Sequence, residues 1–179
     1  MCIRDRMRIL YVTNDVPWPL TSGYLRHFHF IRALARDHAV TLLSLEKPGH
    51  EPGDAAALAP HTERVVTVPA TLGRGSGRQR SRARLAAIVA GGDPAARELG
   101  RIGAALHADA PFDAVLISGK RSFPVLRDLP ALPLVTDLCD ATSLRLRRQA
   151  RHARWRRRLP LAVEHLEAVS YTHLTLPTN

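Results

Sequence analysis

The sequence has few cysteines, few aromatic residues and no long hydrophobic run, and each shortage excludes a class of protein. Its two cysteines, Cys2 and Cys139, cannot build a disulfide framework or a metal cluster. No apolar run approaches the ~20 residues of a membrane-spanning helix. With 179 residues and 45% hydrophobic content, the chain can bury one core. We therefore expect a single cytoplasmic domain without a bound metal.

Positive charge is in excess, and it is carried almost entirely by arginine. The formal net charge at pH 7 is +10, and only two of the 26 basic residues, Lys47 and Lys120, are lysines. The charge peaks in Arg145–Arg158, where arginines would cover most of the circumference of a helix. Such a segment attracts phosphate groups. It can be a solvated helix with distant acidic partners, a surface that docks on anionic membranes, or a nucleic-acid-binding element. Nucleic acid is the least favoured of the three, because aromatic residues make up only 5% of the chain.

Strand and helix patterns alternate along the chain. Short runs rich in β-branched and apolar residues predict strands over 8–13, 40–45, 64–68, 113–118 and 133–137. Helical spacing predicts helices from residue 24, near 55, over 82–90, over 95–108 and from 142 toward 168, with a Gly/Ser/Arg loop over 71–80. This alternation is typical of an α/β fold, and we predict one Rossmann-like, doubly wound parallel sheet.

A polar loop follows the first predicted strand, at the end of the sheet where such folds bind ligands. Ser22 and Gly23 lead into the first helix, so backbone N–H groups there could hold a diphosphate or an acceptor phosphate. Arg26 could add a charge-assisted bond to that phosphate. The alternative is a plain capping turn, with Ser22 as N-cap and Arg26 in solvent. The pattern is not G-x-G-x-x-G, so it does not favour a dinucleotide cofactor.

Polar residues also follow the fourth and fifth predicted strands. Ser118, Gly119 and Lys120 follow the fourth, where they could bind phosphate but offer no general base at neutral pH. Asp137 and Asp140 follow the fifth. One of these carboxylates could bind an acceptor hydroxyl or act as its base, or the pair could cap the next helix.

Three further residues near the first loop are expected to be structural. His27 and His29 lie on the first predicted helix, where a lone histidine more often packs or bonds locally than it reacts. Trp18 stands between two prolines, and we expect it to anchor the loop by packing rather than to stack on a sugar.

The order of these motifs resembles a known family. The residues M-R-I-L-Y-V-T at 7–13, P-W-P-x-x-S-G at 17–23 and L-x-x-x-H-x-V-T-L-L-S-L at 34–45 resemble the start of a family 4 glycosyltransferase of the GT-B fold. The stretch D-L-C-D-A-T-S at 137–143 extends the resemblance. It implies transfer of a sugar from a nucleotide-sugar to a glycan or lipid-linked acceptor, in bacterial cell-surface polysaccharide or glycolipid synthesis. It also implies no cofactor beyond the nucleotide-sugar co-substrate, and a location at the inner face of the plasma membrane.

The same resemblance covers only the N-terminal, acceptor-side half of such an enzyme, over residues 7–168. The C-terminal domain that holds the donor nucleotide would be missing, so we expect the isolated chain to be inactive. Some family members carry a histidine after the fourth strand, and this sequence has none there. We expect residues 1–6 and the arginine-free residues 169–179 to be non-native, of the kind that sequencing-adaptor read-through adds. A natural flexible tail is the alternative.

Two other classes of function fit the sequence. One is a stand-alone Rossmann-like module that binds a phosphate-bearing ligand. The other is a basic protein that binds an anionic membrane or nucleic acid through Arg145–Arg158.

Overall fold

A five-stranded, all-parallel sheet forms the centre of the molecule. The computed structural model describes residues 6–21, 23–47, 49–51, 53–71, 76–137, 142–152, 158, 160–166 and 169. The strand order is β3-β2-β1-β4-β5. The strands are β1 (Arg8–Thr13), β2 (Ala39–Glu46), β3 (Arg64–Pro69), β4 (Ala114–Ser118) and β5 (Leu134–Asp137). Each lies within one residue of its predicted bounds, and the predicted Rossmann-like α/β fold is confirmed.

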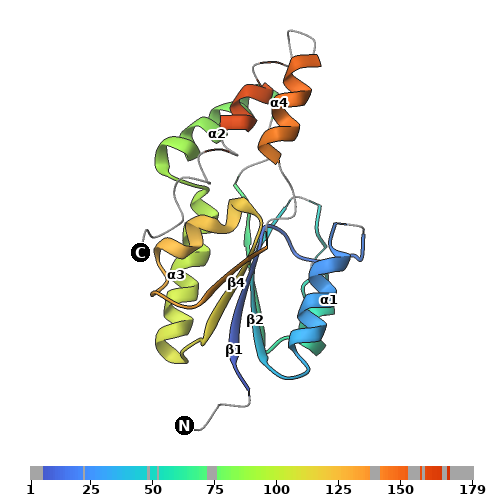
Figure 1. Cartoon of the computed structure of the whole chain (residues 1–179), viewed down its shortest axis with the longest axis vertical. Coiled ribbons are helices and arrows are strands. Elements are labelled where there is room, and N and C mark those ends of the chain that lie inside the picture. Colours follow the sequence, from blue (N-terminus) through green and yellow to red (C-terminus); the bar gives the residue numbers. More distant parts are fainter. Residues whose placement is uncertain are drawn as a thin grey trace.

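Helices cover both faces of this sheet. The helices of the described residues are α1 (Leu25–Leu34), η1 (Ala56–His61), α2 (Gly77–Ala90), α3 (Pro94–Asp109), η2 (Lys120–Arg127) and α4 (Thr142–His152), and residues 160–166 are also helical. Of these, α1 and η1 pack on one face of the sheet and α3 and η2 on the other. Figure 1 shows α1 on one side of the strands and α3 on the other. The sequence predicted no helix at η2, which is a 3-10 helix with an internal proline and a buried Phe123.

The central strand β1 contributes side chains to both halves of the core. Its alternating side chains point to opposite faces. Leu10 and Val12 join the cluster under α3 and η2, while Tyr11 joins the cluster under α1 and η1. Trp18 packs on Phe28 of α1 with ring centroids 5.8 Å apart, so it anchors the loop as predicted. Because β1 is buried on both faces, it holds the residues that follow it in a fixed position.

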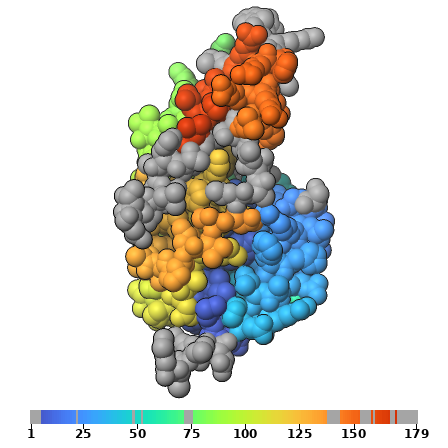
Figure 2. Space-filling view, viewed as in Figure 1, coloured from blue at the N-terminus to red at the C-terminus, as the bar shows by residue number. Residues whose placement is uncertain are grey.

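Two helices, α2 and α4, extend beyond the sheet. They lie past the carboxyl ends of the strands in Figure 1, and in Figure 2 they project from the body of the molecule. Helix α2 begins at Gly77, so the prediction of a loop through residue 80 is wrong. The reason is a capping box, in which the Gln79 side chain accepts a hydrogen bond from the Ser76 backbone at 2.8 Å.

Over the residues described above, no helix combines the length and the apolar character that are needed to cross a membrane.

Candidate functional site

The direction of strand addition reverses between β1 and β4. From β1 the chain adds β2 and then β3 on one side, and it returns to add β4 and β5 on the other side. In open α/β sheets, ligands bind beyond the carboxyl ends of the strands at such a switch point. The candidate site therefore comprises the residues that end β4 and β5 and the first turn of α1, which packs beside them.

Asp137, at the end of β5, is held by an arginine from α1. Arg26 places a guanidinium nitrogen 2.5 Å from Asp137 Oδ2, and the Asp137 side chain is 18% exposed. Arg26 also stacks on the Phe30 ring, with 5.7 Å between the guanidinium carbon and the ring centroid. This ion pair joins two residues 111 positions apart in the sequence. It fixes the orientation of the carboxylate and leaves Arg26 in contact with an acidic partner rather than with solvent alone.

Ser118 lies between that carboxylate and a histidine. Its hydroxyl oxygen is 3.5 Å from Asp137 Oδ2 and 3.5 Å from His27 Nε2, both at the long limit of a hydrogen bond. The other ring nitrogen of His27, Nδ1, is 2.7 Å from the Tyr11 hydroxyl. Ser118 and Tyr11 are buried, whereas His27 is half-buried. Four polar side chains from α1, β1, β4 and β5 therefore converge at the switch point.

His27 is predominantly neutral at neutral pH in this setting. Burial lowers the pKa of His27, the nearby Arg26 charge lowers it further, and the Asp137 carboxylate opposes both effects. A neutral imidazole can accept a proton. If Nδ1 donates its hydrogen to the Tyr11 oxygen, Nε2 presents its lone pair toward Ser118. The arrangement can accept a proton from a hydroxyl group bound beside Ser118.

Gly119 has a packing role at this edge. Its φ angle is +83°, and a Cβ atom there would lie 1.8 Å from Asn14 Nδ2. Asn14 in turn accepts a 2.7 Å hydrogen bond from the Ser122 hydroxyl. The glycine thus lets the loops after β1 and β4 come into contact. Lys120 is half-buried and begins η2, one residue further on.

Other residues predicted for the site fall in different places. Gly23 is exposed, with no atom within 4 Å of a Cβ built on it, so packing does not require glycine there. Ser22 and Asp140 lie outside the described residues, and their predicted roles stay predictions. Helix α1 begins after Tyr24, whose side chain forms no capping bond.

A second polar cluster lies at the carboxyl ends of β1 and β2. The buried Asp15 carboxylate contacts Lys47 Nζ at 2.6 Å and His50 Nε2 at 2.8 Å, and it accepts a short hydrogen bond from the Tyr24 hydroxyl. Burial alone would raise the pKa of Asp15, but the hydrogen bonds and charge of Lys47 and the Tyr24 bond outweigh it, and the pKa is lowered. Burial and the bond to Asp15 raise the pKa of Tyr24. His50 also contacts Asp54 at 2.8 Å. The cluster ties the loops beside the site together.

The sequence does not predict His27 as a site residue. The family resemblance implies a histidine after the fourth strand, whereas His27 comes from α1, 91 positions before Ser118. The available signal was indirect: α1 packs on the same face as Tyr11, and residues 26 and 27 lie in its first turn near the sheet edge.

Comparison with known proteins supports the fold. No protein family model matches the chain, and no curated protein matches it in sequence. Two solved structures of the C-terminal domain of a hydrogenase from Pyrococcus furiosus are similar to it. The first has 14% identity and a TM-score of 0.50, over 76% of this chain and 96% of that chain. The second has 17% identity and a TM-score of 0.46, over 74% and 92%.

A third similar structure is described as the glycotransferase of kitacinnamycin. It has 18% identity and a TM-score of 0.47, over 75% of this chain and 30% of that chain. At such identities a structural likeness concerns the fold and not the function. The chain is thus a Rossmann-like α/β protein, with a polar cluster at the switch point of its sheet.

Proposed function

We propose that this chain is the acceptor-side domain of a glycosyltransferase, which transfers a sugar from a nucleotide-sugar to a hydroxyl group of a glycan or lipid-linked acceptor. The observation that carries the proposal is the convergence of His27, Ser118 and Asp137 at the switch point. The motifs over residues 7–45 supply the class of reaction, because their order resembles family 4 glycosyltransferases.

The chemistry needs a proton acceptor, and His27 suits that role. The acceptor oxygen bonds to the anomeric carbon as the bond from that carbon to the diphosphate breaks. The diphosphate leaves with the bonding electrons, and the proton of the acceptor hydroxyl passes to a base. His27 Nε2 can take this proton because its lowered pKa keeps the ring neutral. Asp137, held by Arg26, then stabilises the imidazolium that forms.

The remaining roles belong to the same proposal. Ser118 would orient the acceptor hydroxyl between His27 and Asp137. Lys120 would supply positive charge for phosphate. The nucleotide of the donor would be held by a second domain, and no cofactor would be needed. Exposed arginines on α4 would add contact with an anionic membrane, where a lipid-linked acceptor is found.

An NMR titration of the isotope-labelled chain tests the proposal. The ligands are a panel of methyl glycosides as acceptor probes, and uridine and guanosine diphosphates as probes of the donor. We expect glycosides to shift the His27 ring and the Ser118 amide signals, because an acceptor hydroxyl belongs beside them. Substitution His27→Gln should weaken glycoside binding, whereas Arg36→Gln, on an exposed turn after α1, should not.

The same titration separates this function from a stand-alone phosphate-binding module. Such a module predicts that the nucleoside diphosphates, and not the glycosides, shift the signals at the switch point. That result would contradict the acceptor-side assignment and would favour the module.

A further inference from the structure

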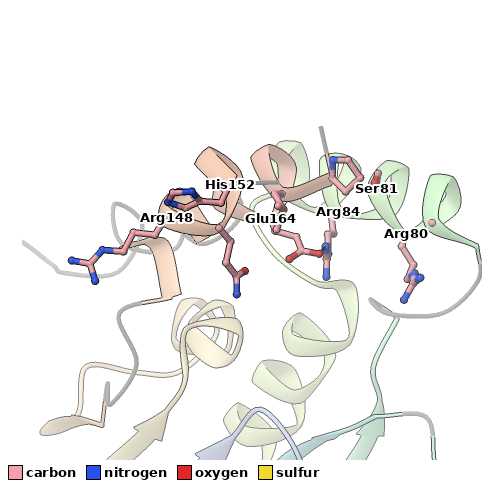
Figure 3. Close-up of a pocket in the computed structure, with 10 residues that line it drawn as sticks. Arg80, Ser81, Arg84, Arg148, His152 and Glu164 are labelled. Carbon is pink, nitrogen blue, oxygen red and sulfur yellow. Dashed lines mark hydrogen bonds and ion pairs between the residues drawn. The ribbon is translucent and has the colours of Figure 1, made fainter. Parts of the chain in front are cut away.

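A basic groove lies away from the switch point, between α2, α4 and the helical residues 160–166. Its volume is about 1230 Å³. Figure 3 shows Arg148 and His152 coming from α4 on one side of Glu164, with Arg80 and Arg84 from α2 on the other. None of the side chains of the switch-point cluster lines this groove.

Helical spacing explains why these side chains gather. On α2, Gly77, Arg80 and Arg84 recur at intervals of three and four residues, and on α4 Arg148 and His152 are four apart. Residues at such intervals share one face of a helix. One basic face from each helix therefore borders the same space.

The groove keeps uncompensated positive charge. Among the described residues that line the groove, Glu164 is the one acidic side chain, and it forms an ion pair with Arg84. Within the described part of the chain, Arg80 and Arg148 are exposed and form no ion pair. The amino end of α2, at Gly77, also lines the groove, and the helix dipole is positive at that end. Each of these features favours an anion.

We propose that this groove binds a phosphate-bearing ligand, with Arg80 and Arg148 as its principal contacts and Ser81 and His152 as further hydrogen-bond partners. The planar guanidinium group matches the oxygens of a phosphate in a bidentate manner. The volume exceeds the range of roughly 300–1,000 Å³ of ordinary ligand pockets. The groove therefore suits a phosphate carried by a larger molecule, such as a nucleoside diphosphate or a lipid headgroup, and its role is separate from proton transfer at the sheet edge.

Calorimetric titration of the full chain with inorganic pyrophosphate and with uridine diphosphate tests the soluble source. Sedimentation with phosphatidylcholine vesicles containing phosphatidylglycerol tests the lipid source. We expect Arg80→Gln and Arg148→Gln each to weaken binding about tenfold, the effect of losing one charge-assisted contact. Arg148→Lys should weaken it less, because the charge remains. Both residues are exposed, so these variants should fold normally.

Two control variants make the result decisive. Arg36→Gln removes the same charge at an exposed position near the opposite end of the sheet. Arg26→Gln removes the arginine at the switch point. If the chain binds vesicles but not pyrophosphate, and the Arg80 and Arg148 variants lose vesicle binding, the phosphate belongs to a lipid headgroup. Absence of binding in both arms would overturn the proposal. The proposal would also be overturned if Arg36→Gln weakened binding as much as Arg80→Gln and Arg148→Gln do, or if binding were lost only in Arg26→Gln.

Discussion

Gly119 is the glycine at the candidate site whose backbone and surroundings both disfavour a side chain. Its φ of +83° disfavours any side chain, and an added Cβ would displace the Asn14 amide that accepts a hydrogen bond from Ser122. We expect Gly119→Ala to lower the free energy of unfolding by roughly 1–3 kcal/mol, as measured by urea denaturation.

Gly23 provides the matched comparison. A Cβ atom at Gly23 meets nothing within 4 Å, so Gly23→Ala should change the stability by less than about 0.5 kcal/mol. If the two variants were equally stable, the backbone at Gly119 would not be constrained as described.

The titration of His27 reports directly on its neighbours. Because burial and Arg26 lower the pKa of His27 and Asp137 raises it, each neighbour has a signed effect. NMR of the ring protons should give a midpoint below about 6.5, the usual value for histidine. Asp137→Asn should lower this midpoint further, and Arg26→Gln should raise it. A midpoint that is unaffected by both changes would contradict the arrangement of His27, Arg26 and Asp137.

At the scale of elements, the start of α2 depends on its capping box. Ser76 and Gln79 satisfy backbone groups that the first turn of the helix would leave unpaired. We expect Ser76→Ala to cost about 1 kcal/mol and to increase amide hydrogen exchange in the first turn of α2. Thr62→Ala, which removes a side-chain hydrogen bond to the Leu58 carbonyl, controls for a general loss of stability: it should leave exchange in α2 unchanged.

The elements that the sequence predicts well are those that local pattern determines. Strands β1 and β2 are continuous apolar runs, and the α1 pattern places Phe28 and Ile31 in the core. The sequence predicts the start of α2 too late, because its glycine, serine and arginine residues indicate a loop more strongly than the short capping box from Ser76 to Gln79 indicates a helix. The sequence does not predict η2, because Pro124 and a polar first turn are not typical of a helix. Phe123 and Val125 are buried by tertiary packing, which no local pattern indicates.

The candidate site depends on packing more than on motif. Sequence order alone places Ser118 and Asp137 at strand ends, and the parallel sheet brings those ends together. No local pattern pairs Arg26 with Asp137 or His27 with Ser118, because these contacts depend on how α1 packs against the sheet. The contacts of Arg26 and His27 therefore follow from the position of α1 on the sheet, which the motif of the first loop does not predict.

At the scale of the whole molecule, the positive charge is concentrated beyond the carboxyl ends of the strands. Arg147 and Arg151 are exposed and lie four residues apart on α4, and neither lines the groove. We expect the double substitution to glutamine to weaken binding to phosphatidylglycerol vesicles roughly thirtyfold, at about 1 kcal/mol for each arginine. Higher salt should weaken binding of the unmodified chain. Vesicle binding that is insensitive to salt and to both changes would argue against membrane contact through α4.

Acid should destabilise the whole molecule in part through Asp15, which joins the loop after β1 to the start of α1 and to the loop after β2. Lys47, His50 and Tyr24 all contact its buried carboxylate. The pKa of Asp15 is lowered in the folded state, so the unfolded chain binds this proton more readily. The stability it contributes is present above about pH 4, near the ordinary aspartate value, and is lost as pH falls through the lowered pKa.

Asp15→Asn should therefore reduce the loss of stability on acidification below about pH 4, although the variant is less stable at neutral pH. Urea denaturation over a series of pH values measures both effects. Glu98→Gln, which alters an exposed carboxylate paired with Arg101 on the surface of α3, should keep the acid dependence of the unmodified chain. If Asp15→Asn lost stability below pH 4 as steeply as the unmodified chain, its carboxylate would not be the ionised centre of this cluster, and the loops beside the candidate site would owe their positions to packing instead.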